Sequence, residues 1–104
     1  MNFILGTAQF GLNYGVSNVY GKTQEHELKK ILDIALLHGF RKIDTAIDYG
    51  DSESVLGKVG IKEFEVITKI NPLKIHGNNA FSLILSDVEN SLRRLKIDQL
   101  EAVL

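Results

Sequence analysis

The sequence of 104 residues contains no cysteine. A disulfide framework and a cysteine-ligated zinc site are therefore both excluded, and a reducing compartment is compatible with this composition. What is present is ordinary for a globular domain, because 44% of the residues are hydrophobic and 24% are charged. A disordered chain is excluded on this ground, and the length allows one domain of modest size.

An excess of one charge is also lacking, since 12 Lys and Arg residues stand against 13 Asp and Glu residues. With no basic run longer than a pair, we expect no nucleic-acid-binding surface. The longest apolar stretch, residues 31–37, is interrupted by Asp33 and is far shorter than the roughly 20 residues of a membrane-spanning helix. The N-terminus has no basic region before an apolar one, which predicts a cytoplasmic protein without a signal peptide.

The hydrophobic pattern predicts four strands that alternate with three helices. We expect strands at residues 2–8, 40–46, 64–70 and 98–104 because short apolar or β-branched runs occur there. Helices are predicted from an N-cap at Thr23 to the stop signal His38-Gly39, at residues 52–59 and through the apolar stripe of residues 81–95. Glycines 6, 11, 15 and 21 predict an irregular loop after the first strand.

Alternating strands and helices imply right-handed crossovers and a parallel sheet. Two α/β architectures remain open at this point, an open doubly wound sheet and part of a closed (β/α) barrel. In both, functional residues gather at the C-terminal ends of the strands. The segments to inspect are therefore residues 6–9, 44–49 and 68–71.

Two glycine-containing segments look like nucleotide-binding motifs but lack essential parts. Gly21-Lys22-Thr23 resembles the end of a P-loop, yet Val16 stands where that motif needs a glycine. Residues 6–11 follow a predicted strand, but the middle glycine of the dinucleotide fingerprint is missing. We interpret both segments as turns.

Metal-binding patterns are incomplete as well. His26 begins a helix like that of a zinc protease, but Lys30 replaces the second histidine. We expect all three histidines to be exposed to solvent: His26, His38 and His76. Four acidic residues lack the spacing of a calcium loop and predict a solvated loop with one functional carboxylate and no metal: Asp44, Asp48, Asp51 and Glu53.

Three polar residues are expected to converge at the strand ends. Asp44 ends the second strand, Tyr49 follows five residues later, and Lys69 ends the third strand. Singly they are a turn-capping Asp, a half-buried Tyr and a Lys whose ammonium reaches solvent. Together they suggest a proton-donating tyrosine, because a cation beside a phenol stabilises the phenolate and makes the phenol a better general acid. Asp44 would hold the cation, Lys69, in place.

These segments resemble the aldo-keto reductase family. Residues 44–57 are similar to its Asp-Thr-Ala-x-x-Tyr-Gly-x-x-Glu-x-x-Leu-Gly signature with matching spacing. Val66-Ile67-Thr68-Lys69 resembles its lysine strand, and residues 91–98 resemble its Ser-Leu-x-x-Leu-x-x-Asp segment. Leu5-Gly6-Thr7-Ala8 resembles the first barrel strand, so the similarity covers nearly the whole chain.

The resemblance implies an oxidoreductase on a (β/α)8 barrel that reduces an aldehyde or ketone with NADPH, with NADH as the alternative cofactor. It assigns Tyr49 as the general acid, Lys69 as the cation that tunes this acid and Asp44 as the partner of Lys69. It also implies that four residues lie near the nicotinamide ring: Gly6, Thr7, Ala8 and Asp44.

The resemblance further implies that residues 1–104 are the N-terminal segment of one incomplete barrel domain, about 40% of a typical barrel. The family's catalytic histidine would fall at about position 106 by the register of Asp98. We therefore expect the 104 residues alone to be inactive. The alternative is a non-catalytic half-barrel that senses cofactor or self-associates, and a third option is an unrelated small doubly wound domain.

Overall fold

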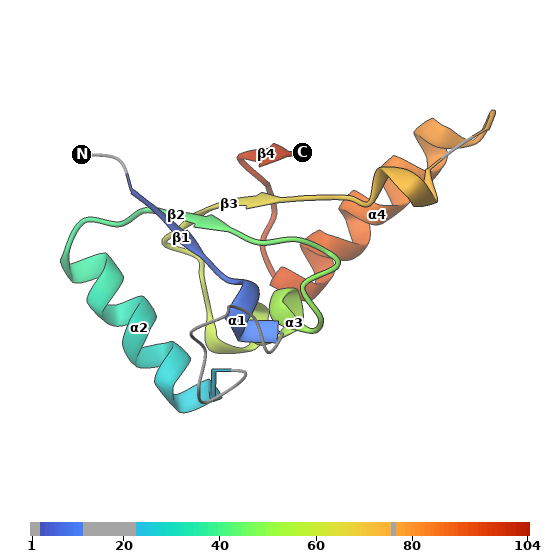
Figure 1. Ribbon diagram of the computed structural model, residues 1–104. Coiled ribbons are helices and arrows are strands. Elements are labelled where there is room, and N and C mark those ends of the chain that lie inside the picture. Colours follow the sequence, from blue (N-terminus) through green and yellow to red (C-terminus); the bar gives the residue numbers. More distant parts are fainter. Residues whose placement is uncertain (1–2, 12–22, 76) are drawn as a thin grey trace.

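The structure is a computed structural model that describes residues 3–11, 23–75 and 77–104. Strands and helices alternate along the chain (Figure 1). The strands are β1 (Ile4–Gly6), β2 (Lys42–Asp44), β3 (Glu65–Thr68) and β4 (Ala102–Val103). The helices are α1 (Ala8–Gly11), α2 (Glu25–Leu37), α3 (Ser52–Val59), the 3₁₀ turn η1 (Pro72–Lys74) and α4 (Ala80–Leu95).

The four strands form one parallel sheet in the order β1-β2-β3-β4. The register pairs Gly6 with Asp44, and Asp44 with Ile67. This sequential order lacks the reversal typical of an open doubly wound sheet and is that of successive strands in a (β/α) barrel. The predicted α/β class with parallel strands is confirmed, and the barrel-type order decides between the two architectures.

The start of the chain differs from the prediction, which continued the first strand to Ala8 and placed a loop after it. Ala8 instead begins the helical turn α1, in which the Phe10 amide donates to the Thr7 carbonyl oxygen at 2.9 Å. Burial of the Phe10 ring in the core stabilises this turn. The high glycine content concealed it, and the rest of the predicted glycine-rich loop, residues 12–22, lies outside the described residues.

Helix α2 matches the predicted apolar stripe but begins one residue later than expected. Its N-cap is Gln24 and not Thr23, and no side chain caps the helix. The Thr23 amide instead donates to the Gln9 carbonyl oxygen at 2.8 Å, which ties the helix entry to α1. The predicted stop is confirmed by Gly39, whose φ of +87° favours glycine.

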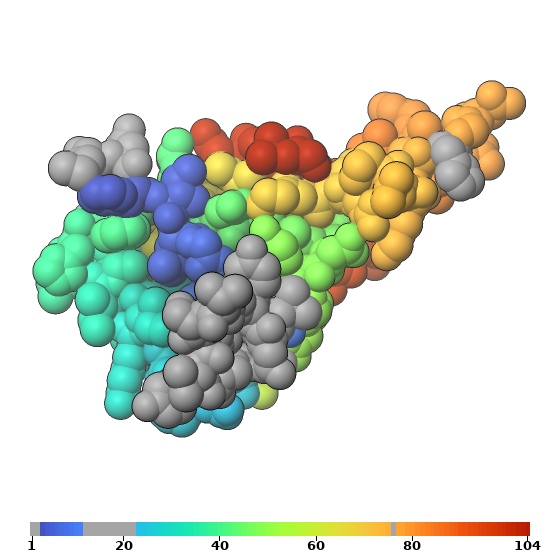
Figure 2. Space-filling view, in the orientation of Figure 1, coloured from blue at the N-terminus to red at the C-terminus, as the bar shows by residue number. Residues whose placement is uncertain are grey.

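Helices α3 and α4 pack closely at one glycine. A Cβ atom on Gly57 would lie 1.9 Å from the Arg94 carbonyl oxygen, so only glycine allows this approach. The C-terminal half of α4 buries Ser91 and Leu95, whereas its N-terminal half extends beyond the sheet (Figures 1 and 2). Phe81 on that extension is 78% exposed.

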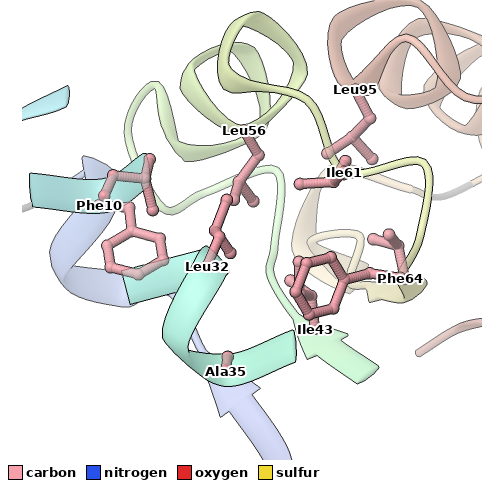
Figure 3. Close-up of a cluster of buried hydrophobic side chains, with 10 residues drawn as sticks. Phe10, Leu32, Ala35, Ile43, Leu56, Ile61, Phe64 and Leu95 are labelled. Atoms are coloured by element: carbon pink, nitrogen blue, oxygen red, sulfur yellow. The ribbon is translucent and has the colours of Figure 1, made fainter. Parts of the chain in front are cut away.

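The hydrophobic core fills the space between the sheet and the helices (Figure 3). In Figure 1, α1, α2 and α3 all lie on the same side of β1, β2 and β3. Because successive strand residues point to opposite faces, this side receives alternate residues of each strand. The core consists of Phe10, Leu28, Leu32, Ala35, Ile43, Leu56, Ile61, Phe64, Val66 and Leu95.

Residues of the opposite face therefore lie between the core residues in sequence. Lys42 and Asp44 flank buried Ile43, and Ile67 and Lys69 flank buried Thr68. None of these four flanking residues is fully buried. The fold thus places the charged residues of β2 and β3 on the sheet face that α1, α2 and α3 leave open.

Candidate active site

The ends of β1, β2 and β3 are held together by backbone hydrogen bonds that continue past the strands themselves. The Thr7 amide donates to the Asp44 carbonyl oxygen at 3.1 Å, and the Thr45 amide donates to that of Ile67 at 2.8 Å. The Ile47 amide donates to the Lys69 carbonyl oxygen at 3.1 Å. These bonds bring residues 6–8, 44–49 and 69 to one edge of the sheet.

At this edge the Lys69 ammonium contacts the Asp44 carboxylate directly, as an ion pair and hydrogen bond. It also donates to the Thr45 carbonyl oxygen at 3.1 Å. Both charged side chains are about one-third exposed, 31% for Lys69 and 38% for Asp44. The ammonium is therefore fixed by two acceptors while it remains accessible to a molecule bound on the open face.

Tyr49 completes this group. It lies on the turn between β2 and α3, where its amide donates to the Ala46 carbonyl oxygen at 3.2 Å. The Lys69 Nζ atom is 5.3 Å from the centroid of the Tyr49 ring, within the range of a cation–π contact. The structure thus brings together the three residues singled out from the sequence.

A hollow of about 400 Å³ lies beside these residues and is lined by α1, the end of β1, Asp44 and Tyr49. Gly6, Thr7 and Ala8 all line it. A Cβ atom on Gly6 would meet no protein atom within 4 Å, so the sheet is open in front of this residue. Thr7 is different, because its side chain is buried and its hydroxyl donates to the Asp44 carbonyl oxygen at 2.9 Å.

These residues fit a nicotinamide ring in their chemistry. A glycine with free space before it admits a flat ring close to the backbone, and Ala8 adds only a methyl group. Asp44 and Tyr49 place polar groups at the rim of the same hollow. Thr7 would act through its backbone and through Asp44, since its side chain faces the protein interior.

Sequence reasoning missed Gly11 as a residue that shapes the site. A Cβ atom there would lie 1.8 Å from the Tyr49 carbonyl oxygen and 2.6 Å from the Ser52 nitrogen. The α1 turn therefore rests directly against the backbone of the Tyr49 turn. The predicted irregular loop gave no sign of this contact, because the two segments are far apart in sequence.

The acidic cluster predicted from residues 44–53 does not form a common site. Asp48 pairs with Lys74 at 3.5 Å, whereas Glu53 is buried and pairs with Arg94 at 2.7 Å. The prediction that all four carboxylates belong to a solvated loop is wrong for Glu53, which α3 carries into the interior. In residues 3–11, 23–75 and 77–104, no group of three or more His, Cys, Asp or Glu side chains could hold a metal ion.

The remaining sequence features lie away from this edge or outside the described residues. His26 and His38 are exposed as predicted. His76 and the Gly21-Lys22 pair fall outside the described residues. Within the described part of the chain, no helix has the length and apolar character needed to cross a membrane.

Comparison with known proteins points to one family. The model of the Aldo/keto reductase family matches residues 2–104. Aldo-keto reductase YhdN of Bacillus subtilis is 36% identical over 111 residues, which cover 93% of this chain and 31% of that protein.

Two solved structures extend the comparison to the fold. A protein of Pseudomonas aeruginosa assigned to the aldo-keto reductases is 30% identical with a TM-score of 0.78, over 97% of this chain and 40% of its own. The holo form of aldo-keto reductase AKR11C1 from Bacillus halodurans is 23% identical with a TM-score of 0.70, over 98% of this chain and 34% of its own, and shares the fold. The chain thus spans between 31% and 40% of the length of these three proteins.

Proposed function

This chain belongs to the aldo/keto reductase family, and on that premise we propose that it carries the proton-donating part of an NAD(P)H-dependent carbonyl reductase. The substrate would be a small molecule with an aldehyde or ketone group. The observation that carries the proposal is the position of the Lys69 ammonium, in contact with the Asp44 carboxylate and 5.3 Å from the Tyr49 ring. We propose no nucleic-acid or membrane partner for this protein, and its cytoplasmic location remains a prediction from the sequence.

Tyr49 is the proposed general acid, which donates its hydroxyl proton to the carbonyl oxygen of the substrate. The negative charge that develops on the phenol oxygen is stabilised by the neighbouring Lys69 ammonium. Asp44 and the Thr45 carbonyl oxygen hold that ammonium in place, so the protein has little reorganisation to make during the reaction. We assign these roles to Tyr49, Lys69 and Asp44 as catalytic residues.

The hollow beside Tyr49 is the proposed place of the nicotinamide ring. When bound, NADPH or NADH would supply hydride to the carbonyl carbon. Gly6 and Ala8 would leave room for the ring, Thr7 would shape the backbone beneath it, and Asp44 would line its rim. The preference between NADPH and NADH would depend on groups that bind the rest of the nucleotide.

We also propose that residues 1–104 form the N-terminal segment of one barrel domain that is incomplete as given. The support is the sequential strand order of the parallel sheet, together with the finding that the chain spans 31–40% of the length of its relatives. The remaining strands would supply the other nucleotide-binding segments and the histidine expected at about position 106. Residues 1–104 alone are then expected to turn over no carbonyl compound.

The test is oxidation of NADPH with a panel of aldehydes and ketones. It uses the intact protein, by which we mean the complete barrel that this proposal expects. Tyr49→Phe is expected to lower turnover by roughly 10²–10⁴-fold, while cofactor affinity, measured by fluorescence quenching, stays within about twofold of the wild type. Retention of turnover by Tyr49→Phe would overturn the proposed role of the phenol.

A second candidate is a non-catalytic, self-associating half-barrel that senses cofactor. The observation that favours it is the exposure of large apolar side chains at the sheet: Phe3, Ile4 and Leu104. Such side chains favour association with a second copy. Size-exclusion chromatography of residues 1–104 tests it, since a clean monomer would contradict assembly, and cofactor binding without turnover by the intact protein would support sensing.

A further inference from the structure

Each predicted site segment at the ends of β1, β2 and β3 contains a fully buried threonine. Thr7 lies between Gly6 and Ala8, Thr45 follows Asp44, and Thr68 precedes Lys69. All three threonine side chains are 0% exposed. Thr45 and Thr68 bond α3 side chains, whereas Asp44 and Lys69 contact one another at the open edge. The buried hydroxyl groups thus belong to the sequence neighbours of residues that we propose for catalysis or cofactor binding.

Ser52, the first residue of α3, joins two of these hydroxyl groups. Its Oγ atom lies 3.1 Å from Thr45 Oγ1 and 3.2 Å from both the hydroxyl and the carbonyl oxygen of Thr7. Thr7 Oγ1 in turn donates to the Asp44 carbonyl oxygen at 2.9 Å. One serine hydroxyl therefore connects the end of β1 with the end of β2, beside the backbone of Asp44.

Glu53, the second residue of α3, holds the third threonine. Its Oε2 atom accepts a hydrogen bond from Thr68 Oγ1 at 2.7 Å. Its Oε1 atom accepts from Ser91 Oγ at 3.2 Å and from Arg94 Nε at 2.8 Å. The Glu53 side chain is only 3% exposed, so its charge is balanced by the Arg94 guanidinium and not by water.

These contacts exceed what packing alone requires. A buried ion pair can often be replaced by apolar side chains with no loss of stability, and the rest of the interface between the sheet and the helices is an apolar core. What hydroxyl and carboxylate groups add is directionality, because hydrogen bonds fix angle as well as distance. Ser52 and Glu53 both direct such hydrogen bonds to the threonines at the strand ends.

We propose that Ser52 and Glu53 are positioning residues that fix the strand ends in register and so aim Lys69 and Asp44 at Tyr49. The proposal rests on the proposed function, because it assigns the purpose of the register to carbonyl reduction. Neither residue touches the hollow beside Tyr49. They act through Thr45 and Thr68, the neighbours of Asp44 and Lys69.

The decisive variant in the intact protein is Thr68→Val. It keeps the shape of the side chain and removes the hydroxyl that donates a hydrogen bond to Glu53. We expect kcat to fall about 10-fold, since small displacements of catalytic groups are costly, while KM for the carbonyl and the Kd for NADPH stay within about twofold. Thr68→Ser retains the hydroxyl and is expected to keep kcat within about twofold of the wild type.

Two controls separate positioning from general destabilisation. Ile61→Val removes one methylene from the core and is expected to lower Tm without lowering kcat. Ser52→Ala is expected to lower kcat by a factor similar to that of Thr68→Val. Ser54→Ala, on the same helix, is its matched control and is expected to leave kcat unchanged.

A measurement without turnover keeps this proposal distinguishable from the proposed function. The side-chain NMR signal of Lys69 is expected to move in Thr68→Val and to stay in place in Thr68→Ser and Ile61→Val. If the wild type reduces no carbonyl compound, the proposed function fails, and the Lys69 signal still reports whether the Thr68–Glu53 hydrogen bond positions Lys69. Equal Lys69 signals in Thr68→Val and Ile61→Val would overturn the positioning role, as would equal kcat values.

Discussion

Two ion pairs meet the end of β3 on opposite sides. Lys69 pairs with Asp44 on the open side of the sheet, and the preceding residue, Thr68, bonds Glu53, which pairs with Arg94 on the helix side. Both partners of the first pair are about one-third exposed, whereas in the second pair Glu53 is 3% exposed and Arg94 is 37% exposed. Two neighbouring residues at the end of β3 thus contact ion pairs whose carboxylates have very different exposure.

The difference in exposure gives the two pairs different uses. A buried carboxylate is tolerated only when hydrogen bonds replace its water, and Glu53 accepts them from Thr68, Ser91 and Arg94. An ion pair whose partners are both about one-third exposed contributes little to stability, so we infer that the Asp44–Lys69 pair serves the proposed reaction. We expect the pair with the buried Glu53 carboxylate, called the buried pair below, to govern unfolding and the accessible Asp44–Lys69 pair to govern turnover.

The largest effect on stability should come from breaking the buried pair. Arg94→Met leaves the Glu53 charge without its counter-ion and is expected to cost about 3 kcal/mol of unfolding free energy. Urea denaturation measures this loss. Arg93→Met is the matched control, because Arg93 is exposed and bonds only Asn90 among the described contacts. Equal losses in the two variants would show that Glu53 does not depend on Arg94.

The next effect comes from the glycine that lets α4 approach α3. Gly57→Ala places a Cβ atom 1.9 Å from the Arg94 carbonyl oxygen, which forces the helices apart and weakens the Glu53–Arg94 pair. We expect a loss of about 2 kcal/mol in the same denaturation experiment. Ser54→Ala, on the exposed side of α3, should change stability by less than about 0.5 kcal/mol. A Gly57→Ala protein as stable as Ser54→Ala would contradict the close contact.

The accessible pair should show the opposite balance. Asp44→Asn frees Lys69 from its carboxylate, so we expect turnover to fall about 100-fold with less than about 1 kcal/mol lost in stability. The matched control is Glu65→Gln, which breaks the Lys42–Glu65 pair at 3.9 Å on the same sheet face. Its NADPH oxidation should stay within about twofold of the wild type, and an equal loss in both variants would mean that turnover depends on charge anywhere on this face and not on the Asp44–Lys69 contact.

The smallest effect is expected at a surface pair between α2 and α3. Lys58 lies 3.2 Å from Glu25, and both side chains are exposed. Lys58→Met should change unfolding free energy by about 0.5 kcal/mol or less, and the change should shrink further at high salt. A loss as large as that of Arg94→Met would remove the basis for the contrast between buried and accessible pairs.

The order of strands and helices could be read from the sequence because the signals are local. The apolar stripe of α2 and its stop at Gly39 both follow from residues close together in the chain. The turn α1 could not be read in this way, since its anchor is Phe10 in a core contributed by distant elements. The same limit applies to Thr23, because its backbone bond to Gln9 arises from tertiary structure.

Within the candidate site, the sequence predicted which side chains meet but not what holds them. Asp44, Tyr49 and Lys69 were found because parallel strand ends converge and because their spacing resembles a family signature. The prediction that Glu53 belongs to a solvated loop was wrong, because its position close to Asp51 in sequence suggested that both carboxylates are exposed to solvent. Only the fold reveals that Glu53, two residues after the N-cap Asp51, faces the interior.

The alternation of Thr68 and Lys69 along β3 has a consequence for protein engineering. The Thr68 side chain, which bonds Glu53, and the Lys69 side chain, which belongs to the proposed site, point in opposite directions although they are adjacent in sequence. A combinatorial library restricted to outward positions of the sheet, such as 67 and 102, leaves the inward hydroxyl of Thr68 untouched. Such a library can thus vary the open face of the sheet without removing the hydrogen bond between Thr68 and Glu53.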